Sequence, residues 1–258
     1  MSTPGEQSRL RRTLPPTVAI LVVVAVWWAV TAWFGVPKYL IPAPQDVIVA
    51  LGRYWGTLWS ATVVTGSETL LGLLAGVIAA AIISVTVYAV KPLRSALEPL
   101  LIGTQTVPVM VFAPILTIAL GYGIASKIVI VALLCFFPVT VSLLAGLQGV
   151  DPRLIDTMRT LWASPGGLFW RVRMPFALPQ GFAGLRISVT FAPVAAVFGE
   201  YAGSSNGLGY HLIQAIPRLR TDFVFAEVVL LTAMTAALYL LTLLAERLVC
   251  GWQRDRLR

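Results

Sequence analysis

The chain has 258 residues, of which 58% are hydrophobic and only 12% are charged. Soluble domains carry roughly 25% charged residues, so the composition excludes an ordinary soluble protein, and the hydrophobicity excludes a disordered chain. Two cysteines are too few for a disulfide scaffold, and the single His211 cannot form a metal site of several histidines. The composition therefore indicates an integral membrane protein, and we expect no metal and no cofactor.

The net charge of +8 would favour nucleic-acid binding in a soluble protein. Here the basic residues lie between long apolar stretches, where they set membrane orientation and contact anionic lipid. We therefore expect membrane lipid, and no nucleic acid, as a partner.

A helix needs about 20 apolar residues to cross the bilayer. Apolar stretches of that kind predict an all-α integral membrane protein with six transmembrane helices, near residues 17–35, 64–90, 99–121, 125–147, 177–201 and 223–247. The first stretch is longer than the apolar part of a signal peptide and has no small-residue cleavage site after it. We therefore expect it to be retained as a span.

The basic residues predict the topology. We expect a cytoplasmic tail over residues 1–16, a transmembrane domain over 17–250 and a cytoplasmic tail over 251–258. With both termini inside, thirteen of the 19 Lys and Arg residues fall on the inner side and five on the outer side, including Lys127. This bias is typical of a multi-pass protein with cytoplasmic termini.

The longest inner loop, about residues 148–178, is polar enough to leave the bilayer. Asp151 followed by Pro152 predicts a helix start, and apolar residues at helical spacing follow, giving one apolar face. A second short helix is expected around Leu168 to Val172, after a break at Pro165-Gly166-Gly167. The apolar face suits either a membrane surface or a soluble partner, and the residues alone do not decide between the two.

From Asp156 this loop reads DTMRTLWASPGGLFWRVRMPFALP. It resembles the EAA loop of ABC importer permeases, whose pattern is E-A-A, three residues, G, nine residues, I, one residue, L-P. Asp156 stands at the acidic position and Trp162 at the glycine. The resemblance implies a type I ABC importer permease fold, with a cytoplasmic coupling helix that contacts an ATP-binding subunit through Asp156, Thr157, Met158, Arg159, Trp162, Val172, Met174 and Pro175. Since Trp is enriched at interface hot spots, Trp162 is expected to pack against that partner; the alternative is that it lies at the lipid interface.

The resemblance covers about residues 41–252. Over this range the chain is similar to the sulfonate, taurine and nitrate permease group. Three segments look most like permeases for pyrimidine precursors of thiamine: Gln105 to Pro108, Cys135 to Pro138 and Leu219 to Ala226. The resemblance implies a bacterial inner membrane location, separate ATP-binding subunits, an extracytoplasmic solute-binding protein and a homodimer. No GxxxxGK[ST] motif is present, so ATP would be used by the partner subunits and the chain itself is not expected to be an enzyme.

Charged side chains and prolines within membrane helices are candidates for function. We expect the translocation path to include Glu68, Gln105, Pro108, Pro138, Glu200 and Tyr201. Such a path would favour a neutral or weakly cationic heteroaromatic solute over a strong anion. Arg186 either pairs with one of the two glutamates or extends to the cytoplasmic interface.

Gly72 and Gly76 form a GxxxG spacing, which predicts a close contact with another helix. Two functions of other classes stay open from the residues: a proton-coupled secondary transporter that uses Glu68 and Glu200, and a membrane scaffold without transport.

Overall fold

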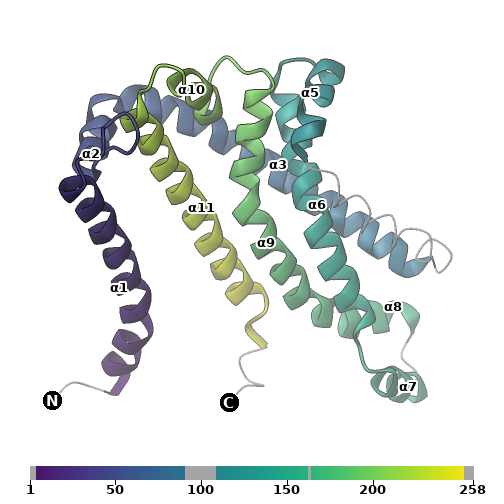
Figure 1. Ribbon diagram of the computed structural model, residues 1–258. Helices are drawn as coiled ribbons and strands as arrows, with labels where there is room; N and C mark the ends of the chain where they lie inside the picture. Colours follow the sequence, from purple (N-terminus) through teal and green to yellow (C-terminus); the bar gives the residue numbers. More distant parts are fainter. Residues whose placement is uncertain (1–3, 91–108, 162–163, 253–258) are drawn as a thin grey trace. The chain divides into compact units, whose positions relative to one another are not determined.

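The computed structural model describes residues 4–90, 109–161 and 164–252, and every regular element in those ranges is helical. The elements are α1 (Pro4–Trp33), α2 (Pro44–Arg53), α3 (Trp55–Ala89), α5 (Val109–Leu120), α6 (Ile124–Gln148), α7 (Pro152–Thr160), α8 (Pro165–Leu168), the π-helical turn η1 (Phe169–Arg173), α9 (Met174–Tyr201), α10 (Leu208–Ala215) and α11 (Thr221–Val249). The expected all-α class is confirmed, and Figure 1 shows the helices in chain order.

Four stretches of continuous helix in the described residues are long and apolar enough to cross a membrane: Trp55–Ala89, Ile124–Gln148, Pro165–Tyr201 and Thr221–Val249. They coincide with the expected second, fourth, fifth and sixth spans. Two shorter apolar helices, Val18–Trp33 and Val111–Leu120, coincide with the first span and with part of the third. The start of the third span, together with Gln105 and Pro108, lies outside the described residues.

Two helix boundaries differ from the expected ones. α1 begins at Pro4 rather than near residue 17, where the expected membrane span begins. Arginine and glutamine are too polar for a membrane span but are good helix formers, so the helix extends beyond the apolar stretch. Helix also begins at Pro165, well before the expected start of the fifth span at 177. The sequence predicts a break at Pro165-Gly166-Gly167, but these residues form the first turn of α8. Proline is tolerated at the first helical position because its missing N–H would have no partner within the helix there.

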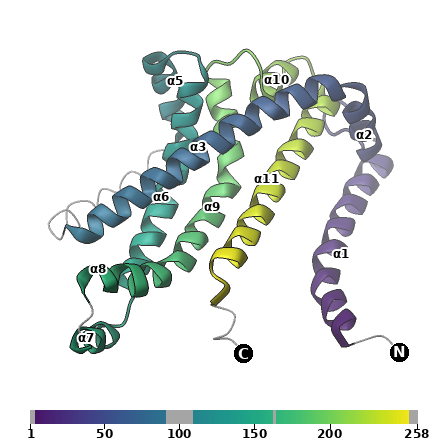
Figure 2. The same ribbon diagram turned by 180° about the vertical axis from the view of Figure 1, so that it is seen from behind.

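The chain forms two compact units, one of residues 1–59 with 212–229 and one of residues 60–211 with 230–258. In the second unit α6 and α9 lie side by side in opposite directions (Figure 1). Figure 2 shows the same pair from behind, with α5 at one end and α7 and α8 at the other. The pair therefore forms the packed centre of this unit.

Small residues bring α6 and α9 close together. A Cβ on Gly184 would lie 2.5 Å from the carbonyl oxygen of Pro138, and one on Gly146 would lie 2.7 Å from the Cα of Ala177. The Ser188 hydroxyl donates to the Cys135 carbonyl at 2.9 Å across the same contact. Close approach of this kind is how membrane helices gain packing energy when lipid is as apolar as their side chains.

The GxxxG spacing on α3 is confirmed as a packing motif. A Cβ on Gly72 would lie 2.4 Å from the Cβ of Val131, and one on Gly76 would lie 2.7 Å from the carbonyl oxygen of Ala132. Both glycines therefore face α6, which completes a tightly packed trio of helices.

The first unit contains α2, which follows the Ile41-Pro42-Ala43-Pro44 segment. Asp46 accepts a hydrogen bond from the Ala43 N–H at the helix start and pairs with Lys38 at 2.8 Å. The hydrogen bond from Lys38 lowers the pKa of the Asp46 carboxyl from its ordinary value. The Arg220 guanidinium lies over Tyr54, 4.7 Å from the ring centre, and over Phe223, 4.9 Å from its ring centre. These contacts hold α2 to residues 220–223 of the same unit.

We predict that Gly76→Ala destabilises the chain, because its methyl group would meet the Ala132 carbonyl, a backbone atom that cannot move aside. Overpacking of this kind costs about 1–3 kcal/mol, measurable as a lower unfolding midpoint of the detergent-purified protein. Gly66→Ala is the control on the same helix, since its methyl would meet only the Met234 sulfur at an ordinary 3.6 Å. Equal midpoints for the two variants would contradict the close contact at Gly76.

Candidate functional site

The inner loop forms a helical hairpin whose first helix is α7. The Asp151 carboxylate accepts from the Arg153 N–H at 2.8 Å, and Pro152 takes the first helical position. The helix start expected at Asp151-Pro152 is thus confirmed. The side chain supplies an acceptor that the first turn of a helix otherwise lacks.

The apolar face of α7 packs against the chain itself. Ile155 is buried with Val150 and Leu168, and Met158 and Val172 pack against this cluster. Neither a lipid surface nor a soluble partner is therefore needed to cover the centre of this face, although both were open from the sequence.

The second half of the hairpin is α8 with the π-helical turn η1. The Ser164 hydroxyl accepts from the Gly167 N–H at 3.1 Å and caps the start of α8. From there the chain continues as helix through η1 into α9. The hairpin is consequently joined to a membrane helix without a loop.

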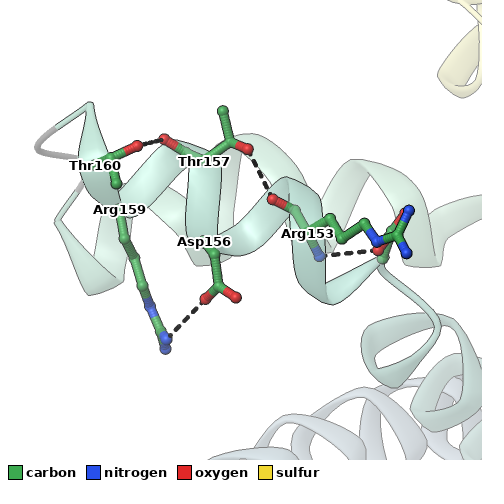
Figure 3. A network of polar contacts seen from close by, with 6 residues as sticks. Arg153, Asp156, Thr157, Arg159 and Thr160 are labelled. Atoms are coloured by element: carbon green, nitrogen blue, oxygen red, sulfur yellow. Dashed lines mark hydrogen bonds and ion pairs between the residues drawn. The ribbon is translucent and has the colours of Figure 1, made fainter.

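Most of the exposed side chains of α7 are polar, and Figure 3 shows five of them. Thr157 donates to the Arg153 carbonyl at 2.8 Å, and Thr160 donates to the Thr157 carbonyl at 2.6 Å. Asp156 and Arg159 form an ion pair at 3.5 Å, with side chains that are 73% and 65% exposed. An exposed pair of this kind adds little stability, so both groups are free to bind elsewhere.

The expected coupling residues divide into two sets. Asp156, Thr157 and Arg159 are exposed, whereas Met158, Val172, Met174 and Pro175 are half-buried. Among the half-buried residues, Met174 packs against Leu143, Leu147 and Ala177 of the α6–α9 contact. Trp162 lies outside the described residues.

Arg173 holds the hairpin to the membrane helices, a role that the sequence did not reveal. Its guanidinium donates to the Leu147 carbonyl at 3.2 Å and lies 4.9 Å from the Tyr88 ring centre. The same side chain borders a hollow of about 250 Å³ between Tyr88, Arg159 and Phe169. Its place in a run of basic residues gave no sign of these contacts.

Three charged side chains lie buried at the opposite end of the unit. Glu68 is 3% exposed, Glu200 is 2% exposed and Lys127 is 1% exposed. Lys127, which the sequence assigns to the outer side, lies inside the protein, where its amino group donates to three backbone carbonyls. Glu200 accepts from Thr65 and from the Gly209 N–H. Tyr201 and Pro138 are half-buried.

Arg186 pairs with Glu246, the partner that the sequence did not indicate. The two side chains are 29% and 19% exposed, and they join α9 to α11 within the second unit. The two glutamates considered as partners, Glu68 and Glu200, are not the ones it contacts.

We predict that Arg186→Met destabilises the protein, because it leaves the Glu246 carboxylate partly buried without its partner. The expected cost is about 1–3 kcal/mol, below the value for a fully buried pair. The double variant Arg186→Met/Glu246→Met should recover most of this loss. Chemical unfolding in detergent measures both, with Arg53→Met, at an exposed position, as the control. Additive losses in the double variant would contradict the pairing.

The chain is similar to proteins of known class. The family described as "Binding-protein-dependent transport system inner membrane component" matches residues 72–250. A probable ABC transporter permease protein of Haemophilus influenzae is 38% identical, over 88% of this chain and 93% of the relative. A riboflavin transport system permease protein of Chloroflexus aurantiacus is 32% identical, over 93% of this chain and 90% of the relative.

A formylaminopyrimidine transport permease protein of Halalkalibacterium halodurans is 28% identical, over 96% of this chain and 99% of the relative. Together with the apolar helices, these matches show that the chain belongs to the family of binding-protein-dependent transport system inner membrane components, the permease subunits of ABC importers.

Proposed function

We propose that the chain is a six-span permease subunit of type I fold that moves a small solute inward by ATP-driven alternating access. Both termini lie in the cytoplasm and the protein resides in the bacterial inner membrane. The observation that supports this most is the hairpin of α7, α8 and η1. Its exposed side chains are mostly polar, and Arg173 and Met174 hold it to α6 and α9.

The outward face of α7 binds an ATP-binding subunit in this proposal. Asp156, Thr157 and Arg159 make the contact, and Trp162 packs beside them as an apolar anchor. The half-buried residues Met158, Val172, Met174 and Pro175 act from within in this proposal. Met158 and Val172 pack inside the hairpin, and Met174 packs against α6 and α9, so that the hairpin and the membrane helices move together. When the ATP-binding subunits close, the hairpin moves with them and the membrane helices move with the hairpin.

The remaining partners follow from the family. An extracytoplasmic solute-binding protein delivers the solute, and a second copy of the chain completes the pathway. ATP is used by the partner subunits, since the sequence has no phosphate-binding loop motif of its own.

The proposed path includes Glu68, Gln105, Pro108, Pro138, Glu200 and Tyr201. Pro138 supports this role through its position, because proline in a membrane helix frees a carbonyl that protein or a water-filled cavity must satisfy. Both carboxylate oxygens of Glu200 already have donors within the chain, so Glu200 shapes the path rather than binding the solute.

The proposed solute is a hydroxymethylpyrimidine-type precursor of thiamine. Two relatives support a nitrogen heterocycle, since one is named for formylaminopyrimidine and the other for riboflavin. The alternative is taurine, an aliphatic sulfonate or nitrate, supported by relatives named for taurine and aliphatic sulfonates at 28% and 27% identity. Proton-coupled transport and a scaffold role are further alternatives, and both would work without an ATPase.

We predict that the complex with its ATP-binding subunits and binding protein takes up hydroxymethylpyrimidine in proteoliposomes, and that vanadate stops the uptake. No uptake is expected from a proton gradient without ATP. Parallel assays with taurine and an alkanesulfonate decide the solute, because uptake of a sulfonate alone would contradict the heterocycle.

We also predict that Asp151→Ala weakens coupling, because loss of the cap costs α7 about 1 kcal/mol. ATP hydrolysis stimulated by the solute-loaded binding protein should fall, and less ATP-binding subunit should copurify. Asp151→Ser is the matched control, since serine also caps helices. If Asp151→Ala keeps the same stimulated ATP hydrolysis and the same amount of copurified ATP-binding subunit as Asp151→Ser, α7 is not the coupling element.

A further inference from the structure

The segment between α9 and α10, residues 202–207, is held at its beginning by Lys127. The amino group donates to the carbonyl of Gly203 at 2.6 Å, to that of Tyr122 at 2.7 Å and to that of Gly123 at 3.1 Å. An ammonium has three donors, and all of them are used. Lys127 thereby joins the turn between α5 and α6 to the 202–207 segment.

The same segment is held at its end by Glu200. One carboxylate oxygen accepts from the Thr65 hydroxyl at 2.6 Å, and the other accepts from the Gly209 N–H. The Thr65 oxygen also accepts from the Leu208 N–H at 2.9 Å. The first N–H groups of a helix have no partner within it, so α10 begins where α3 and α9 supply acceptors.

Glycines make this arrangement possible. A Cβ on Gly207, whose φ is +122°, would lie 2.3 Å from the Glu200 carboxyl carbon, and one on Gly209 would lie 2.6 Å from the Val197 carbonyl oxygen. At the other end, a Cβ on Gly203 would lie 2.3 Å from the Tyr122 ring. The segment therefore fits against its supports without room for side chains.

Glu68 lies beside Glu200 but is not one of these supports. Its carboxyl interacts electrostatically with Glu200, and one of its oxygens is buried without a hydrogen-bond partner in the described part of the chain. Because Glu68 is placed in the proposed path, it does not serve as a control. Thr69 lies one turn from Thr65 on α3, is fully buried, and donates its hydroxyl to the Thr65 carbonyl at 2.7 Å. Thr69→Val is therefore the matched control for Thr65→Val.

We propose that Glu200, Thr65 and Lys127 are positioning residues of the transport cycle. They fix the 202–207 segment so that the nearby ends of α3, α6, α9 and α10 move as one body. The solute-binding protein then docks on a rigid outer end of the permease. The resulting movement is transmitted along α9 to the hairpin that precedes α9 in the chain. The transmission of movement from the binding protein to the hairpin rests on the proposed function. The hydrogen bonds that fix the 202–207 segment are present whichever solute is transported.

The first experiment is hydrogen–deuterium exchange of the assembled complex. In the wild type, the amides of Leu208 and Gly209 should exchange slowly, because both are bonded inside the protein. Thr65→Val and Glu200→Gln should raise exchange at these amides about tenfold, while α6 and the rest of α9 keep wild-type exchange. Thr69→Val should leave both amides protected.

The second experiment measures ATP hydrolysis with and without the hydroxymethylpyrimidine-loaded binding protein. Stimulation should fall several-fold in Thr65→Val and Glu200→Gln and stay normal in Thr69→Val. Gly76→Ala serves as a stability control, because it weakens packing away from the segment and should keep its stimulation.

Three outcomes would overturn the proposal: unchanged exchange at Leu208 and Gly209 in Glu200→Gln, equal loss of stimulation in Thr69→Val or Gly76→Ala, or faster exchange throughout the chain in the mild variant Thr65→Val. If the wild-type complex is not stimulated by hydroxymethylpyrimidine at all, the solute assignment fails. The exchange experiment still decides whether Glu200 and Thr65 fix the segment.

Discussion

A membrane interior offers no water to a charge or to a free backbone group, and this constraint accounts for where the polar side chains lie. Lys127 satisfies three carbonyls, and Glu200 satisfies the start of α10 directly and through Thr65. Arg186 and Glu246 satisfy one another. Lys127, Glu200 and the Arg186–Glu246 pair thus replace solvent for groups that the fold would otherwise leave without a partner.

The same constraint favours close contact between backbones. With lipid as apolar as leucine, tighter packing comes mainly from removing side-chain bulk. Gly72, Gly76 and Gly184 remove it along α3 and α9, both against α6. A block of three helices in such contact does not deform gradually, because packed interiors shift between discrete arrangements. Alternating access in this family would accordingly move whole blocks.

Local signals allowed much of the fold to be predicted. The apolar stretches, the Asp151-Pro152 helix start and the GxxxG spacing each depend on a few neighbouring residues. Four of the six expected spans, the helix start and the close contact at the glycines were confirmed. The burial of Lys127 could not be predicted, because its acceptors are backbone carbonyls, which have no sequence signature. The Arg186–Glu246 pair depends on the rotation of two helices sixty residues apart in the chain. The periodicity of α7 showed that one face would be covered but not that Leu168 and Val150 would cover it.

The π-helical turn η1 has a consequence for how the sequence can vary. A π turn holds one residue more than an α turn, and each helical residue rotates the chain by about 100°. Deleting a single residue within Phe169–Arg173 would convert the turn to ordinary helix and would largely preserve the direction of the helix before it. Deleting a residue from the α-helical part of α9 would instead rotate α8 by about 100°, because no extra residue is there to be lost. The π turn is therefore the one place in this continuous helix where the chain can shorten by a residue while the exposed side chains of α7, including Asp156 and Arg159, keep their direction.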